Sequence, residues 1–278
     1  MLYELAQISI VSRDGKLLTS RRTLAVLLRR IWIAGALTTW CIGAALAVSA
    51  EPLLQPFSHT YVVTANRKGK SFVVSHWNDK LDSINVGGKQ AYRRTQISTQ
   101  VNGKVRTWIS VFNPQTLAPI ADTFDSSDGE IFARVFNGGR VTSYSSSGQT
   151  QGIMSTSTTE VPAHYSDFNG GQFGLALLLL PLSSGYTTTL TSFAPNGEEL
   201  QSVPIAVQKK EKLTYGTCSY DAYVVRASFL AKDYPDEGDN SMTFWVTKKP
   251  PYIVKLVTDA PKIDLKITYE LDDKSRTC

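Results

Sequence analysis

The chain has 278 residues, of which 42% are hydrophobic and 19% charged, and its formal net charge is +5. Six of its 29 basic residues but only two of its 24 acidic residues precede Glu51, so the rest of the chain has a net charge of about +1. This near-neutral balance gives little support to a nucleic-acid partner, and we expect no nucleic-acid binding.

The first 50 residues have the features of an export signal. Arg29 and Arg30 precede an uncharged apolar run over residues 31–48, and the small residues Val48 and Ala50 suit a signal peptidase that cuts after Ala50. We therefore expect residues 1–50 to be a signal peptide and residues 51–278 to form a single β-rich domain, periplasmic or secreted. The apolar run is also close to the shortest bilayer span, so an uncleaved inner-membrane anchor facing the periplasm stays open as an alternative.

The first part of this domain has the pattern of antiparallel strands, in which short segments of alternating character are separated by turn residues. Asn102-Gly103 supplies the positive φ angles of a two-residue hairpin turn, and similar turn residues occur at 67–70, 128–129 and 137–139. We expect strands over residues 57–65, 71–77, 90–101, 104–112, 120–124, 131–136, 140–144 and 154–161.

A different pattern follows at residues 173–180, which are too uniformly apolar for an amphipathic element. Asp167 or Asn169 is placed to cap the start of a helix there, and Pro181 would end it. We expect one substantial apolar helix in this segment, buried by the sheet.

Strand patterns resume after the helix, at residues 186–193, 201–208, 222–230, 242–247, 252–258 and 262–271. Together the segments predict an all-β, mainly antiparallel fold, namely a strongly curved open or half barrel that wraps around the one apolar helix. No internal repeat of fixed period is present, which argues against a propeller.

Two cysteines, Cys218 and Cys278, follow the expected cleavage site. In an oxidising compartment such a pair favours a disulfide, and closing a loop of roughly 60 residues would stabilise the fold by about 4 kcal/mol. We expect this bond to fix the polar C-terminal segment, and two free thiols are the alternative.

The order of strands, apolar helix and further strands resembles the C-terminal half of an exported bacterial family, known only as domain of unknown function number three-one-zero-eight. The resemblance covers residues 165–260 and rests on segments 220–225 (YDAYVV), 243–246 (TFWV) and 251–256 (PYIVKL). Lys248-Lys249-Pro250-Pro251 stands where the family usually has an Asp and an Arg before its proline. The resemblance implies an open β-barrel similar to the periplasmic lipoprotein carriers, and it carries over no catalytic residues.

Large apolar side chains are the first candidate site. A curved sheet with few helices can leave an apolar cavity that admits an acyl chain, although the same side chains can simply fill the core. Both interpretations stay open for Trp77, Trp108, Phe112, Phe173, Leu177, Phe244 and Trp245.

A basic turn is the second candidate site. Lys248, Lys249 and Tyr252 surround Pro250-Pro251 between two expected strands. Such a rigid, basic turn suits contact with anionic lipid head groups or with a protein partner, and a solvated hairpin tip is the alternative.

Catalytic and metal chemistry have weaker support. His59, His76 and His164 are never at metal-ligand spacing, so we expect no metal and no cofactor. His164 lies near Asp167 and serines occur over 143–147, but the Gly-x-Ser-x-Gly motif of a hydrolase is absent. We assign no catalytic residue.

These patterns favour an exported protein of the cell envelope that binds a hydrophobic or lipid-like ligand, or an envelope protein partner, without catalysis. A periplasmic serine hydrolase and a purely structural factor in envelope assembly are the alternatives.

Overall fold

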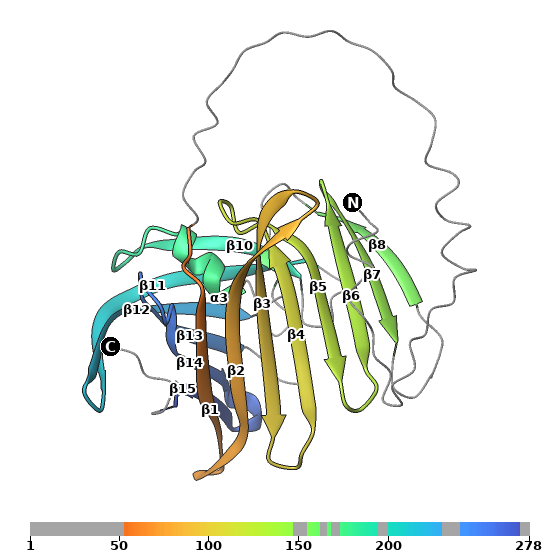
Figure 1. The fold of residues 1–278 in the computed structure, drawn as a ribbon. Coiled ribbons are helices and arrows are strands. Elements are labelled where there is room, and N and C mark those ends of the chain that lie inside the picture. The colour runs from red at the N-terminus through yellow and green to blue at the C-terminus, as the bar shows by residue number, and fades with distance from the viewer. Residues whose placement is uncertain are drawn as a thin grey trace, which may run out of the picture. The chain divides into compact units, whose positions relative to one another are not determined.

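The computed structural model describes residues 53–146, 155–161, 166–167, 173–193, 200–229 and 240–272 (Figure 1). The expected signal segment, with its alternative as a membrane anchor, lies outside these residues. Across the described ranges, every helix is too short or too polar to cross a membrane.

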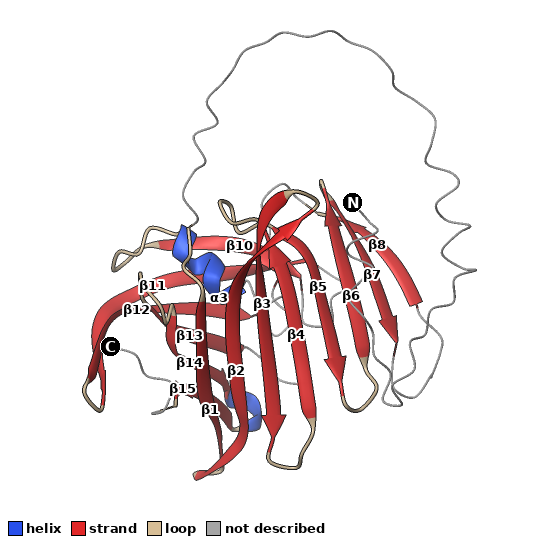
Figure 2. Cartoon of the chain, in the orientation of Figure 1, coloured by secondary structure: helices blue, strands red, loops and turns tan. Residues whose placement is uncertain are grey.

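The described residues are dominated by β-structure (Figure 2). Fifteen strands form one sheet, whose order is β8-β7-β6-β5-β4-β3-β2-β1-β15-β14-β13-β12-β11-β10-β9. The strands are β1 Phe57–Arg67, β2 Lys70–Val86, β3 Lys89–Gln100, β4 Val105–Phe112, β5 Pro119–Ser126, β6 Ile131–Asn137, β7 Arg140–Ser146, β8 Ser155–Glu160, β9 Ser166–Asp167, β10 Thr187–Phe193, β11 Leu200–Tyr215, β12 Cys218–Phe229, β13 Asn240–Val246, β14 Ile253–Ala260 and β15 Leu265–Leu271.

The predicted all-β, antiparallel class is confirmed. Among the described strands, β9 alone pairs parallel to its neighbour, β10. The first and last long strands, β1 and β15, lie side by side in the middle of the order, where Tyr61 pairs with Leu271 and Arg67 with Leu265. Among the described strands the sheet is not closed, because β8 and β9 stand at its two ends.

The hairpin at Asn102-Gly103 is present, but its turn differs from the prediction. Gln100 N–H donates to the Lys104 carbonyl at 2.8 Å, which leaves three residues in the loop instead of two. Gly103 has φ +82°, whereas Asn102 does not have a positive φ and its Oδ1 accepts a hydrogen bond from Lys104 N–H. A three-residue loop with glycine in the left-handed position therefore replaces the expected two-residue turn.

The prediction of one substantial apolar helix over residues 173–180 is wrong, because the segment forms only two short helical turns. A single α-turn, α3 (Phe173–Ala176), continues into the 3-10 turn η1 (Leu177–Leu179). Leu180 is extended, with φ −83° and ψ 153°, because the residue before a proline disfavours the helical region. Pro181 thus ends the helix one residue earlier than the apolar run suggested.

This short helix is nevertheless central to the core. Leu175 and Leu177 are both fully buried, but they belong to different clusters of apolar side chains. Leu175 packs with Leu81, Tyr92 and Phe112 of β2–β4, whereas Leu177 packs with side chains of β11–β13 such as Val203, Val225 and Phe244. Strands from both halves of the order therefore contact the same two turns of helix.

Candidate functional site

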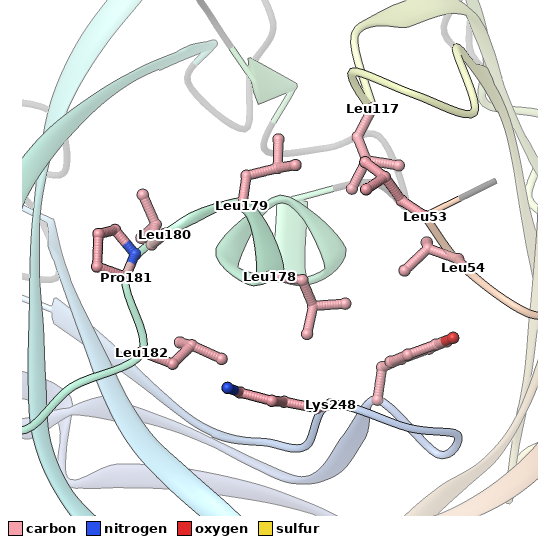
Figure 3. A pocket seen from close by; sticks show the side chains of 10 residues that line it. Leu53, Leu54, Leu117, Leu178, Leu179, Leu180, Pro181, Leu182 and Lys248 are labelled. Carbon is pink, nitrogen blue, oxygen red and sulfur yellow. The ribbon is translucent and has the colours of Figure 1, made fainter. Parts of the chain in front are cut away.

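An apolar pocket of about 320 Å³ lies beside the end of the short helix (Figure 3). Its only polar side chains belong to Lys248 and Tyr252. Leu53 and Leu179 are each 48% exposed, and contiguous exposed apolar surface of this kind marks sites of ligand or protein contact. The lining residues are Leu53, Leu54, Leu117, Leu178, Leu179, Leu180, Pro181, Leu182, Lys248 and Tyr252. We call this site the leucine pocket.

The helix supplies one wall of the leucine pocket. Leu177 is held in the core, and the 3-10 turn has three residues per turn, so Leu178 and Leu179 lie on other sides of the helix. Leu178 is half-buried and packs against both core clusters. Figure 3 shows Leu178, Leu182 and Lys248 around a common space.

The segment before β1 supplies the opposite wall, and two tyrosine hydroxyls hold it in place. Tyr92 accepts a hydrogen bond from Leu54 N–H at 2.8 Å and donates one to the Leu54 carbonyl at 2.5 Å. Tyr252 accepts a hydrogen bond from Gln55 N–H at 2.8 Å. Burial raises the pKa of Tyr92 and of Tyr252, so both hydroxyls stay protonated at neutral pH.

Leu117 reaches the pocket from a strained position in the loop between β4 and β5. Its φ is +54°, a left-handed conformation that aliphatic residues rarely adopt, yet its side chain is only 2% exposed. Asn113 maintains the loop, because its Oδ1 accepts hydrogen bonds from Gln115 N–H and Thr116 N–H at 2.8 and 3.0 Å. Such strain is retained where the surrounding structure imposes it, often at ligand sites.

Lys248 places one cation at the rim. It lies in the loop between β13 and β14, where the Thr247 Oγ1 is 2.7 Å from the Lys249 carbonyl and 2.5 Å from the Pro251 carbonyl and donates its one proton between these two acceptors. The Lys248 Nζ lies 6.0 Å from the centre of the Tyr223 ring. In the part of the chain that the structure describes, no carboxylate forms an ion pair with Lys248.

The predicted site residues divide between several places. Lys248 and Tyr252 line the leucine pocket, whereas Lys249 is exposed and does not. Phe112, Leu177 and Phe244 are buried in the two core clusters. None of the six predicted ligand contacts whose side chains the structure describes lines the pocket, and the side chain of Phe173 lies outside the described residues. A ligand role for those seven stays a prediction.

The predicted tryptophans lie elsewhere on the sheet. Trp77 stacks on Trp108 with ring centres 5.2 Å apart, and Trp245 has the Lys255 ammonium 5.4 Å from its ring. Trp77 also borders a smaller cavity of about 60 Å³, beside the buried ion pair of Asp79 and Arg94. The Arg94 guanidinium donates two hydrogen bonds to the Asp79 carboxylate, at 2.7 and 2.5 Å.

Sequence reasoning missed the walls formed by Leu53, Leu54 and Leu117, because none belongs to a periodic pattern. The hydrolase alternative is not tested, since His164 and Ser147 lie outside the described residues. The disulfide is not tested either, because Cys278 lies outside them as well. Over the described ranges, no three His, Cys, Asp or Glu residues converge as a metal site would require.

Comparison with known proteins places the fold but not the activity. A family model described as "Protein of unknown function (DUF3108)" matches residues 60–268. No curated protein matches the chain. Among solved structures, the beta-barrel-like protein of domain of unknown function DUF1849 from Brucella abortus is similar, with a TM-score of 0.51 and 10% identity. The match covers 80% of this chain and 97% of that one, and at this identity it shows a shared fold alone.

Proposed function

This chain belongs to the DUF3108 family, whose function is unknown, and we propose that it is an exported, non-catalytic protein that binds one acyl chain in the leucine pocket. The carboxylate or phosphate of the ligand lies at Lys248. The single observation that carries this proposal is the combination of an almost wholly aliphatic wall with one ammonium at its rim that forms no ion pair with any carboxylate of the described residues. Curvature of the sheet around α3 and η1 supports it, because the contacts of Leu175 and Leu177 draw both halves of the sheet to the helix that forms one wall.

The volume of the pocket favours a single, medium-length chain. A methylene group needs about the volume of a water molecule in the liquid, roughly 30 Å³, so a pocket of about 320 Å³ holds about ten carbon atoms. Two acyl chains of a phospholipid do not fit within this volume. The ligand class is therefore a fatty acid or another single-chain amphiphile.

The expected affinity is moderate. Burying ten methylene groups contributes about 8 kcal/mol at about 0.8 kcal/mol each, from which the costs of association and ordering are subtracted. The dissociation constant is therefore weaker than about 1 μM. An exposed lysine adds a modest attraction for an anion, and its effect falls with added salt.

Titration with a labelled fatty acid tests the proposal. Radiolabelled decanoic acid is the probe, which is added to the purified protein lacking residues 1–50, and unlabelled decanoic acid then competes with it. We expect saturable binding and displacement by decanoic acid, but much weaker displacement by decylamine, which has the same chain and the opposite charge.

Two pairs of variants locate the site. Lys248→Glu should weaken probe binding about fivefold, which is about 1 kcal/mol, whereas Lys249→Glu should leave it unchanged. Leu179→Asp should abolish binding, whereas Val101→Asp, an equally polar change at another exposed aliphatic residue, should not. No saturable binding, or equal effects of Lys248→Glu and Lys249→Glu, would overturn the proposal. If the purified protein binds no fatty acid but forms a stable complex with another protein, the leucine pocket is a protein-binding site and the fatty-acid proposal is wrong.

A further inference from the structure

We infer that a second surface, at the far end of β1 from the leucine pocket, docks on an anionic membrane. Phe72 and Val73 of β2 and Val101 after β3 are 51%, 41% and 70% exposed. They accompany Arg67, Lys68 and Lys70 of the β1–β2 hairpin. These six residues are called the hairpin patch. The inference does not depend on the ligand proposed for the leucine pocket.

The three apolar residues belong to one surface although they come from two hairpins. Val101 N–H donates a hydrogen bond to the Val74 carbonyl at 3.0 Å, so the tip of the β3–β4 hairpin lies against β2 beside Val73. Figure 1 shows the tips of the β1–β2 and β3–β4 hairpins at the same end of the strands, away from α3. Half of the large hydrophobic side chains that are exposed among the described residues therefore gather here.

The geometry of the β1–β2 hairpin exposes apolar surface on both of its faces. Lys68 and Gly69, with φ values of +52° and +71°, close a tight turn, and Phe72 pairs with Ala65 while Val73 pairs with Thr64. Consecutive residues of a strand point to opposite faces, so Phe72 and Val73 project in opposite directions. A protein partner covers one face of a strand, whereas a tip that enters a lipid interface is surrounded on both.

The charged residues at this end of β1 and β2 favour contact with an anionic surface. Arg67, Lys68 and Lys70 are exposed, and Lys266 lies beside them because it pairs with Asn66. Within the described part of the chain, none of these four cations forms an ion pair. The nearest carboxylate, Asp264, accepts a hydrogen bond from the backbone N–H of Lys68 at 3.0 Å.

The combination of exposed cations with exposed apolar side chains in the hairpin patch indicates the chemistry of the partner. Clustered Lys and Arg residues are attracted to anionic head groups, and adjacent aromatic and aliphatic side chains bury themselves at the boundary with the acyl chains. A nucleic acid would use the cations but would gain nothing from three exposed apolar residues. An anionic lipid surface is the partner that uses both.

Co-sedimentation with vesicles tests the inference. The full protein lacking residues 1–50 is mixed with vesicles of phosphatidylcholine alone, or with a quarter of the lipid replaced by phosphatidylglycerol. We expect at least tenfold tighter partitioning to the anionic vesicles at low salt. Lys68→Glu/Lys70→Glu should lose that preference, whereas Lys89→Glu/Lys212→Glu, the same change of charge at exposed lysines outside the hairpin patch, should keep partitioning within twofold.

A third variant separates insertion from simple charge attraction. Phe72→Ser/Val101→Ser should reduce partitioning about fivefold and leave the circular dichroism melting curve unchanged, because both side chains are exposed. Undiminished partitioning of this variant would overturn the insertion of the tip. Equal partitioning to both kinds of vesicle, no partitioning at all, or an equal loss in the two lysine variants would overturn the docking surface itself.

Discussion

The Tyr92 hydroxyl forms hydrogen bonds with both backbone groups of Leu54, accepting from the N–H at 2.8 Å and donating to the carbonyl at 2.5 Å. Removing this hydroxyl leaves two buried backbone groups without partners. We expect Tyr92→Phe to lower the free energy of unfolding by about 1–3 kcal/mol and to weaken binding of the fatty-acid probe, because Leu53 and Leu54 lose their support. Urea unfolding measures the first effect. Tyr144→Phe, at a 36% exposed tyrosine, is the matched control and should change neither.

Two neighbouring leucines of η1 should have opposite phenotypes. Leu177 is fully buried, so Leu177→Ala should lower the free energy of unfolding by about 2–5 kcal/mol. Leu179 is 48% exposed, so Leu179→Ala should cost less than about 1 kcal/mol but should weaken probe binding. Thermal melts and probe titrations of both variants check the expectation. Equal losses of stability would show that Leu179 belongs to the core and not to a binding surface.

Replacing only one partner of the buried ion pair between Asp79 and Arg94 should strongly lower the free energy of unfolding. Asp79→Asn leaves a guanidinium that is 6% exposed without its carboxylate, and we expect a loss of about 3–5 kcal/mol in the free energy of unfolding. The double change Asp79→Leu/Arg94→Met should cost less than the single change, since no uncompensated charge remains. Lys80→Ala, which breaks a largely exposed ion pair with Asp82, should stay within about 0.5 kcal/mol of the wild type.

Buried tyrosines should make the fold sensitive to alkaline pH. Burial raises the pKa of Tyr269 to about 12, and it also raises the pKa of Tyr61. Above about pH 10 the unfolded chain loses these protons while the folded chain keeps them. The contribution of these two tyrosines to the free energy of unfolding should therefore be constant below about pH 10 and decrease as the pH rises above that value. Urea unfolding across this range should show a shallower decline for Tyr269→Phe, and an unchanged slope in that variant would contradict the assignment.

The disulfide between Cys218 and Cys278 remains a prediction with a structural argument behind it. Cys218 is 3% exposed and lies in the same apolar cluster as Leu271, near the end of the described chain. Seven residues lead from Leu271 to Cys278, and an extended chain covers about 3.3 Å per residue, so the second cysteine can return to the first. Peptide mapping without reductant should recover the linked pair. Two alkylated thiols in the protein isolated from its native compartment would contradict the bond.

Much of the strand pattern was predictable because alternation and turn residues are local signals. The expected segment at 131–136 corresponds to β6, and the turn at Gly138-Gly139 has the predicted positive φ angles. The far half of β2 was missed, since Asp79, Lys80 and Asp82 resemble a loop. Asp79 is itself buried on β2 because Arg94 on β3 neutralises its charge, and that pairing is not visible in the local sequence.

The end of the helix and most of the pocket, by contrast, could not be predicted from local sequence signals. An all-apolar run lacks the periodicity that distinguishes a helix from an extended segment. The end of the helix at Leu179 therefore could not be predicted within residues 173–180. Lys248 and Tyr252 were predicted because a basic turn between strands is a local feature. Leu53 and Leu54 were not, because their segment is held by residues distant in the sequence: the Tyr92 hydroxyl bonds to Leu54 and the Tyr252 hydroxyl bonds to the adjacent Gln55.

The adjacency of β1 and β15 determines the order in which the protein acquires its structure. Each half of the sheet can grow hairpin by hairpin through contacts between consecutive strands, with little loss of loop entropy. The seam between the halves joins Tyr61 to Leu271, about two hundred residues apart in the chain. A chain that lacks β15 therefore has two half-sheets with no strand pairing between them, and we expect this pairing to form only when the complete polypeptide is present.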